Sequence, residues 1–322
     1  MKKNRIMRLF CIAMATLFCL TACGDTNAND VETTPAATTV ETTAATTETP
    51  KPDPKPEDEW VSAIFGGGPF VNQKRGMEKV KKSGFNTIML WSVHVYDDGT
   101  LYLNDIKVAE DGEFVGGPLV KEAWQYLKQE PTNITRVELS VGAWGTKDFE
   151  AIDALIKRDG TGENTILYRN FKALAEACGA DAINYDDETS YDPEVAITFG
   201  RMVESMGMKV TLCPFNHMNY WVAVYEGLGS QLVDRIYLQC YDGGAGNNVA
   251  DWYRAFGNTK IIPGYWCLHG GAGDTAATVT SKLNGVKKYC EGGFMWLYDD
   301  MMNLPAPNSV ADYAEAINKV GK

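Results

Sequence analysis

Residues 181–188 read DAINYDDE, a short apolar run that ends in three consecutive carboxylates. Because side chains alternate along a strand, we expect Asn184, Asp186 and Glu188 to share one face, with Asp187 on the opposite face. Neighbouring carboxylates disfavour each other's ionisation, so one of them tends to hold a proton near neutral pH. This raises a glutamate pKa in the direction that general-acid catalysis needs. A polar strand end facing solvent or a cation is the alternative for this motif taken alone.

Seven other short runs of β-branched or aromatic residues alternate with amphipathic helical stretches, a pattern typical of βα units around a parallel sheet. The length of residues 60–322 matches one (β/α)8 TIM barrel, which we predict as a single domain after a disordered linker. The predicted strands are 61–65, 87–94, 136–142, 180–188, 209–214, 235–241, 260–265 and 292–298, and helices include 73–82, 168–178, 193–206, 274–289 and 309–320.

The segment 96–117 carries an Asp-Gly pair at 98–99 within alternating polar and apolar residues. This pattern predicts a β-hairpin excursion in the second βα loop. The excursion would lie on the face of the barrel where active sites are found.

Four predicted strands together carry a resemblance to a known family. Asp181-x-x-Asn184-x-Asp186-x-Glu188 resembles the D-x-x-D-x-D-x-E signature on the fourth strand of glycoside hydrolase family 18, the chitinases and endo-β-N-acetylglucosaminidases. In the same chain order, SVGA at 140–143 resembles that family's S-x-G-G, QCYD at 239–242 its [MQ]-x-Y-[DN], and GGFMW at 292–296 its G-G-x-M-x-W-type ending. The resemblance extends over residues 60–322 at the level of topology.

The resemblance implies a role for each matching residue. Glu188 would protonate the leaving glycosidic oxygen, and Asp186 would orient the substrate's 2-acetamido group, whose carbonyl oxygen attacks the anomeric carbon. Tyr241 would hydrogen-bond that acetamido group, and Trp296 would form an apolar floor under the sugar; ordinary core packing is the alternative for Trp296. The remaining substrate-binding residues would be Asn184, Gln239, Ser140, Asp242 and Trp91, with no cofactor and no metal.

Two positions depart from the family pattern. Asn184 stands where the family has its second aspartate, so a group that relays charge to its neighbour is neutral here, and Ala182 stands where glycine is usual. The first change leaves the rate and the pH optimum open. The Asp-Asp-Glu run at 186–188 is similar to that of microbial endo-β-N-acetylglucosaminidases, which favours an N-glycan core or a GlcNAc oligosaccharide over crystalline chitin.

The N-terminus has the layout of an export signal. Residues 1–8 are basic, residues 9–20 are apolar, and the run stops at Leu20-Thr21-Ala22-Cys23, which resembles a bacterial lipobox. We therefore expect a lipoprotein signal peptide at 1–22 and a lipidated Cys23 that anchors the protein to the cell membrane without spanning it, facing outside. The alternative is a plain signal peptide cut nearby.

Residues 24–59 contain ten threonines, five prolines and nine acidic residues and almost nothing large and apolar. Such a segment cannot bury enough surface to offset its ordering entropy, so we predict that 23–59 is a disordered tether. The predicted domain organisation is therefore a signal peptide at 1–22, the linker at 23–59 and the barrel at 60–322.

Composition excludes some classes of site and partner. A formal charge of −12, from 42 acidic and 30 basic residues, gives no electrostatic reason to bind nucleic acid. The cysteines beyond Cys23 are odd in number and form no CxxC pair, so neither a zinc site nor a complete disulfide framework is indicated. They are Cys178, Cys213, Cys240, Cys267 and Cys290.

Several weaker candidates lie near the ends of predicted strands. A three-histidine metal site is conceivable, although isolated loop histidines are the commoner case. The glycine run at 66–68 lacks a following Gly-Lys-Ser/Thr, so a tight loop is a better interpretation than a phosphate cradle. The histidines are His94, His217 and His269, and further residues that could line a sugar cleft are Trp144, Trp221, Asn216, Tyr265 and Trp266.

The sequence thus predicts a retaining, substrate-assisted glycosidase acting on β-1,4-linked N-acetylglucosamine at the cell surface. Its partner would be a GlcNAc-containing oligosaccharide or a glycoprotein glycan. A non-catalytic glycan-binding lipoprotein on the same barrel is the alternative, in which Asn184 marks a loss of catalysis. A structural surface protein is the third class considered.

Overall fold

The computed structural model describes residues 59–322, with the exception of residue 73. The predicted signal peptide, Cys23 and all but the last residue of the predicted linker lie outside the described residues.

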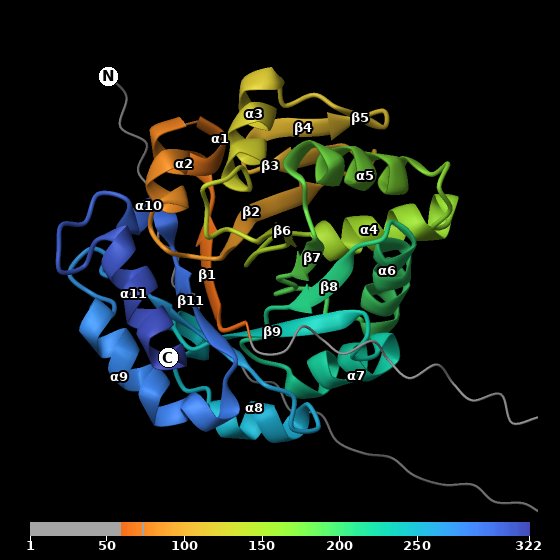
Figure 1. Ribbon diagram of the computed structural model, residues 1–322. Coiled ribbons are helices and arrows are strands. Elements are labelled where there is room, and N and C mark those ends of the chain that lie inside the picture. The colour runs from red at the N-terminus through yellow and green to blue at the C-terminus, as the bar shows by residue number, and fades with distance from the viewer. Residues whose placement is uncertain (1–58, 73) are drawn as a thin grey trace, which may run out of the picture. The chain divides into compact units, whose positions relative to one another are not determined.

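Eight parallel strands form a closed barrel, as the sequence predicts (Figure 1). The first strand pairs with both the second and the last, Val61 lying opposite Gly292 and Ala63 opposite Thr87, and these pairings close the ring. The barrel strands are β1 (Val61–Gly66), β2 (Thr87–Val95), β6 (Arg136–Val141), β7 (Ala182–Tyr185), β8 (Lys209–Leu212), β9 (Val233–Gln239), β10 (Ile262–Trp266) and β11 (Gly292–Trp296).

An antiparallel extension grows from the second barrel strand. β3 (Leu101–Leu103) pairs with β2, β4 (Ile106–Glu110) with β3, and β5 (Glu113–Phe114) with β4. This confirms the excursion predicted at 96–117 and shows that it contains three strands rather than a simple hairpin.

The helices lie outside the ring of strands (Figure 1). All five helices named in the sequence analysis are present with ends shifted by a few residues, as α2 (Lys74–Lys81), α5 (Ile166–Cys178), α6 (Pro193–Ser205), α9 (Ala276–Val286) and α11 (Val310–Gly321). The others are α1 (Gly68–Asn72), α3 (Pro118–Leu127), α4 (Asp148–Asp159), α7 (Met218–Leu228), α8 (Val249–Ala255) and α10 (Tyr298–Met301), with short 3-10 helices η1 (Asp242–Gly244) and η2 (Lys287–Tyr289).

Helix ends follow local sequence signals. The Asp192 side chain accepts from the backbone N–H groups of Glu194 and Val195, and Pro193 occupies the first turn of α6, where its missing N–H costs nothing. At α11, Ser309 and Asp312 form a reciprocal capping box. These signals explain why the ends of α6 and α11 were predictable.

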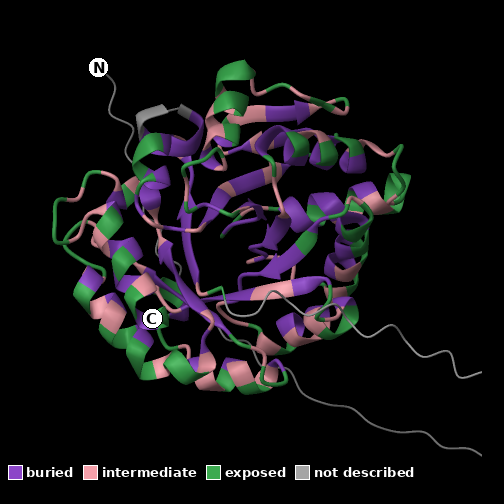
Figure 2. Cartoon of the chain, in the orientation of Figure 1, coloured by how far each residue is buried: buried purple, intermediate pink, exposed green. Residues whose placement is uncertain are grey.

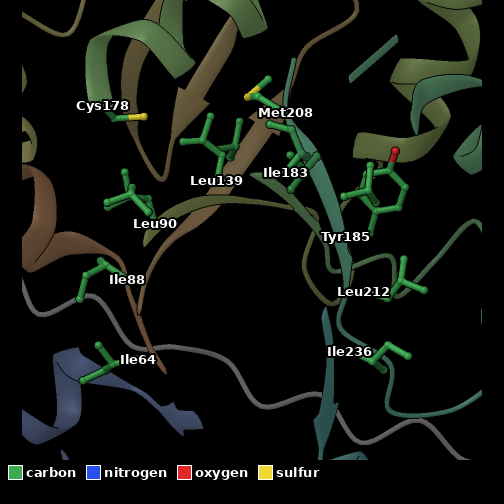
Figure 3. Packing of buried hydrophobic residues seen from close by; sticks show 14 of the residues in the cluster. Ile64, Ile88, Leu90, Leu139, Cys178, Ile183, Tyr185, Met208, Leu212 and Ile236 are labelled. Atoms are coloured by element: carbon green, nitrogen blue, oxygen red, sulfur yellow. The ribbon is translucent and has the colours of Figure 1, made fainter. Parts of the chain in front are cut away.

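Strand alternation divides the core into two parts. Residues pointing outward pack under the helices, and Figure 3 shows several of them, including Ile64, Ile88, Leu139 and Ile183. Residues pointing inward form a second cluster within the barrel. In Figure 2 the strands are largely buried, whereas the outer faces of the helices are exposed. The inner cluster contains Val61, Ala63, Phe65, Met89, Cys213, Tyr237, Ile262 and Phe294.

The five cysteines of the barrel are free thiols, and all but Cys240 are buried. Burial raises the pKa of Cys178 and of Cys290 to about 12, as expected of small apolar core residues. Within residues 59–322, no helix has both the length and the apolar character needed to cross a bilayer.

Candidate active site

The strand that carries the acidic motif is shorter than predicted. β7 ends at Tyr185, so residues 186–188 follow it at the carboxyl end of the barrel, and the Asp186 N–H still continues the ladder by donating to the Val141 carbonyl at 2.9 Å. Catalytic residues of TIM barrels come from this face. The position of the motif therefore agrees with the proposed type of site.

One side-chain amide connects the two carboxyl groups. The Gln239 Nε2 group donates to Asp186 Oδ1 at 3.0 Å and lies 3.3 Å from Glu188 Oε1. On its other side, Asp186 Oδ2 accepts from the Trp91 indole N–H at 3.1 Å. Asp186 is only 3% exposed, whereas Glu188 is partly exposed. The pair thus consists of a buried, firmly held carboxyl and a neighbour that reaches solvent.

Burial raises the pKa of both carboxyl groups. Loss of hydration raises the pKa of Asp186 well above its ordinary value, and the charge of Glu188 raises it further. Burial also raises the pKa of Glu188, although its hydrogen bonds to Gln239 and Asp186 act in the opposite direction. The pair therefore holds a proton at a pH where two exposed carboxylates would have none. A protonated carboxyl beside a carboxylate is what an acid-assisted reaction requires.

An aromatic surface lies next to the pair. The Tyr241 ring stacks on Trp296 at a centroid distance of 5.9 Å, and Trp91 meets Trp296 edge-on at 4.6 Å. All three rings are partly exposed and pack on the inner core cluster. Burial, and more weakly the nearby acidic groups, raises the pKa of Tyr241, so its hydroxyl stays a hydrogen-bond donor. No partner for that hydroxyl is found within residues 59–322.

Ser140 and Asn184 lie beneath this surface rather than on it. Both are completely buried, and the Ser140 hydroxyl donates to the Asn184 carbonyl oxygen at 2.9 Å. Sequence reasoning grouped them with residues that touch substrate. The structure places them inside the barrel, where they support the strand that carries Asp186.

Asp187 points away from the site, as strand alternation predicts. Its carboxylate accepts from the backbone N–H groups of residues 189–191 and from the Tyr220 hydroxyl at 2.7 Å. These bonds fix the loop between β7 and α6. Tyr191 of that loop stacks on His217 at a centroid distance of 3.8 Å. Asp187 is therefore the anchor of the chain that follows Glu188.

The weaker sequence candidates fall into different environments. Asp242 is exposed, and its charge raises the pKa of Glu188, which places it near the pair. Trp144 is 82% exposed, whereas Trp221 and Tyr265 are buried and cannot line a sugar-binding surface. Trp266 stacks on His269 at 3.8 Å.

The histidines do not gather at one site. His94 lies between Ser92 Oγ at 2.8 Å and Asp148 Oδ2 at 3.0 Å, while His217 and His269 each stack on an aromatic ring. In the part of the chain that the structure describes, no three His, Cys, Asp or Glu side chains are arranged to hold a metal ion.

The glycine run at 66–68 forms the tight connection from β1 into α1, in agreement with the tight loop expected from the sequence. Asp299 Oδ2 accepts from the Gly67 N–H at 2.9 Å and Asp299 Oδ1 from the Gly68 N–H at 3.1 Å. The protein's own carboxylate therefore occupies the donors that a phosphate would need.

A groove of about 890 Å³ lies between α1, α2 and α3, away from the carboxyl pair. It is lined mainly by apolar side chains such as Met77 and Leu119.

Similar architectures are found among solved structures. A family 18 chitinase catalytic domain from the fern Peteris ryukyuensis aligns with a TM-score of 0.57 at 15% identity, over 81% of this chain and 98% of that one. A fungal endo-β-N-acetylglucosaminidase of glycosyl hydrolase family 18 gives 0.59 at 16% identity, over 81% and 96%. A mutant family 18 chitinase from Cycas revoluta, solved with (GlcNAc)4, gives 0.53 at 10%, over 81% and 98%. At such identities the likeness shows the fold alone.

No protein-family model matches the chain, and no curated protein matches it in sequence.

The structure brings six of the residues named from the sequence together on one face: Asp186, Glu188, Gln239, Tyr241, Trp91 and Trp296. It also shows a buried carboxylate, Glu138, that the sequence analysis did not single out. The sequence could have pointed to Glu138, because it lies two residues before Ser140 and therefore on the same face of the strand. The chain has the TIM-barrel architecture that family 18 glycoside hydrolases share.

Proposed function

We propose that this protein is a retaining, substrate-assisted glycoside hydrolase that cleaves β-1,4-linked N-acetylglucosamine glycans. The main support for this proposal is the pair of carboxyl groups of Asp186 and Glu188. One Gln239 amide joins the two groups, and their position raises the pKa of both. A binding surface has no need of a proton held in this way. The fold likeness to family 18 enzymes supports the same reaction class.

The reaction follows from the chemistry of the pair. The proton of the pair, which Asp186 and Glu188 share through the hydrogen bond between them, passes from Glu188 to the glycosidic oxygen as the bond from that oxygen to the anomeric carbon breaks. The carbonyl oxygen of the 2-acetamido group forms a bond to the same carbon from the opposite face, and Asp186 stabilises the positive charge that develops on the acetamido nitrogen. Water then attacks the anomeric carbon as its bond to the acetamido oxygen breaks, the 2-acetamido group is restored, and the water gives a proton to the pair through Glu188, so the configuration is retained.

The aromatic residues position the sugar. The Tyr241 hydroxyl donates to the acetamido carbonyl, and the Trp296 ring contacts the apolar C–H face of the sugar. Trp91 holds Asp186 by its indole N–H and forms the edge of the same surface. Asp242 lies at the exposed margin of the pair and would contact the bound glycan.

The proposed substrate is a GlcNAc oligosaccharide or the core of an N-glycan. We further propose that the protein is exported and held at the outer side of the cell membrane by a lipid on Cys23. Mass spectrometry of the native protein tests this directly, since a diacylated or triacylated cysteine at the mature N-terminus is expected and an unmodified terminus contradicts it.

The purified protein should release products from tetra-N-acetylchitotetraose or from a high-mannose glycoprotein. Glu188→Gln should lower kcat by about 10²- to 10⁴-fold, which is the usual contribution of a general acid. Glu163→Gln makes the same chemical change on an exposed loop and should cleave like the parent. Cleavage by the Glu188 variant at the parental rate contradicts the assignment.

A glycan-binding protein without catalysis is the second candidate. The neutral Asn184 favours it, because a carboxylate is absent from the strand face beneath Asp186. Thermal stabilisation by tetra-N-acetylchitotetraose without any cleavage of either substrate would select this function.

A further inference from the structure

A network of polar groups fills the barrel interior below the carboxyl pair. Its centre is Glu138 on β6, which is completely buried. Glu138 Oε1 accepts from the Arg136 guanidinium at 2.6 Å and from the Tyr237 hydroxyl at 2.8 Å, and Oε2 accepts from the Thr211 hydroxyl at 2.5 Å. Arg235 lies 3.8 Å from the same carboxylate. None of these groups takes part in the proposed reaction.

The charges of this network balance. Arg136 forms a two-pronged ion pair with Asp234, at 2.7 and 2.8 Å, in addition to its bond to Glu138. Arg235 donates to the hydroxyl of Thr87 at 2.9 Å and to that of Tyr237 at 3.3 Å. Among the described residues of this network, two guanidinium groups therefore face two carboxylates. The balance matters because an uncompensated charge inside a barrel is expensive.

The hydrogen bonds have only one consistent direction. A carboxylate accepts and never donates, so the single proton of Thr211 is committed to Glu138. The Thr211 oxygen can then only accept from its neighbour Asn184, whose Nδ2 lies 2.9 Å away. With its nitrogen toward Thr211, the Asn184 amide must turn its carbonyl toward Ser140, which donates at 2.9 Å. Glu138 therefore determines the orientation of an amide that it does not touch.

We propose that Glu138 is a positioning residue that, through Thr211, fixes the amide of Asn184 beneath Asp186, and that residues 138 and 184 function as a matched carboxylate–amide pair. This inference rests on the proposed function for its catalytic consequence, because Asn184 lies two residues before Asp186, whose N–H continues the ladder of β7. The pairing itself is a property of the fold.

A carboxylate at position 184 would conflict with this network. In Asn184→Asp, the introduced carboxylate and Glu138 would both approach the Thr211 oxygen, and one proton cannot satisfy two acceptors. Adding Glu138→Gln removes the conflict: Oε1 of the introduced glutamine keeps its place beside Arg136 and Tyr237, so its Nε2 faces Thr211 and donates. The Thr211 proton is then free for the introduced carboxylate, the direction of the chain is reversed, and the net charge returns to that of the parent.

Chemical unfolding of four proteins tests the pairing: the parent, Asn184→Asp, Glu138→Gln and the double variant. Asn184→Asp should raise the unfolding constant about ten- to hundredfold, the range for a buried polar group left unsatisfied. The double variant should be more stable than Asn184→Asp alone, with a coupling of about tenfold. Additive effects of the two substitutions would overturn the inference.

Asn170→Asp provides a matched control. Asn170 is also a completely buried asparagine; it donates to the Gly99 carbonyl at 2.7 Å and accepts from the Gly112 N–H at 2.6 Å, and it shares no partner with Glu138. The change should destabilise the protein, and Glu138→Gln should not rescue it. Rescue of both asparagine variants would show a general effect of charge and would contradict a specific pair.

Kinetics on tetra-N-acetylchitotetraose separate positioning from mere stability. At a temperature where all variants are folded, Asn184→Asp should lower kcat about tenfold or more with little change in KM, and Glu138→Gln in the same chain should restore most of it. Thr211→Val should lower kcat and Thr211→Ser should retain it. Restored stability without restored kcat would overturn the positioning role. A parent that cleaves nothing would refute the proposed function, while the unfolding cycle would still decide the pairing.

Discussion

Replacing Asp186 by asparagine should change how the stability of the protein depends on pH. The folded-state pKa of Asp186 is raised well above its ordinary value of 3.8, so the folded protein binds a proton that the unfolded chain has already released. Stability from this group is therefore complete below 3.8 and is lost as the pH rises toward the raised pKa. The variant has no proton to lose at this position.

The expected magnitude follows from linkage. One extra bound proton lowers the free energy of unfolding by about 1.4 kcal/mol per pH unit, so the parent should lose stability relative to the variant at up to this slope as the pH rises from about 5. Against this, an asparagine can accept from only one of Trp91 and Gln239 through its single oxygen, which costs about 1–3 kcal/mol at every pH. The variant should thus be less stable near pH 5, and its deficit relative to the parent should shrink as the pH rises.

Urea denaturation followed by tryptophan fluorescence at several pH values from about 5 to 8 measures both curves. Asp159→Asn provides a control without a pH slope, because the hydrogen bond from Arg158 lowers the pKa of this carboxylate, which is therefore ionised in both the folded and the unfolded state over this pH range. A difference between parent and Asp186→Asn that stays constant with pH, or that favours the parent more at higher pH, would refute the reasoning.

Three further substitutions test other parts of the site. Tyr241→Phe should lower kcat/KM about tenfold or more by removing one donor to the acetamido group, with thermal stability close to that of the parent; an unchanged kcat/KM would remove Tyr241 from the site. Asp187→Ala removes the acceptor of three backbone N–H groups and of the Tyr220 hydroxyl. Denaturation should show a free energy of unfolding lower by about 2–4 kcal/mol, and the loop after Glu188 should be cut faster by proteases. Equal proteolysis rates would argue against Asp187 as the anchor of this loop. At Gly264 a Cβ would overlap the Phe294 ring, so Gly264→Ala should cost about 1–3 kcal/mol in a melting experiment and disturb the aromatic surface above it; a stability equal to that of the parent would show that the ring can move freely.

Alternation along the strands predicted most of the fold. Apolar residues recur in short runs because each barrel strand is covered by helices outside and packed inside, and the eight runs predicted from this pattern became eight strands. The same rule placed Asp186 and Glu188 on one side and Asp187 on the other. The boundary at Tyr185 was not predictable, because the backbone leaves the sheet where the loop bonds to Asp187 begin.

Contacts between residues on strands far apart in the sequence could not be predicted. Ser140 and Asn184 carry the residue types of a sugar site, yet they are buried because β6, β7 and β8 meet inside a closed ring. The relation of Glu138 to Asn184 passes through Thr211, 73 residues from the first, and no local pattern contains it. Trp221 and Tyr265 were candidates for the surface, and helix packing hides them.

The pairing of β1 with β11, which closes the barrel, affects how the chain folds during its synthesis. Translation delivers the first barrel strand early and its second neighbour almost last, so one edge of β1 stays open during synthesis of the intervening chain. The ring closes only after Gly292–Trp296 has left the ribosome, when Asp299 also reaches the N–H groups of Gly67 and Gly68. A chain released before that point carries an unpaired strand edge and lacks Trp296 beside the carboxyl pair.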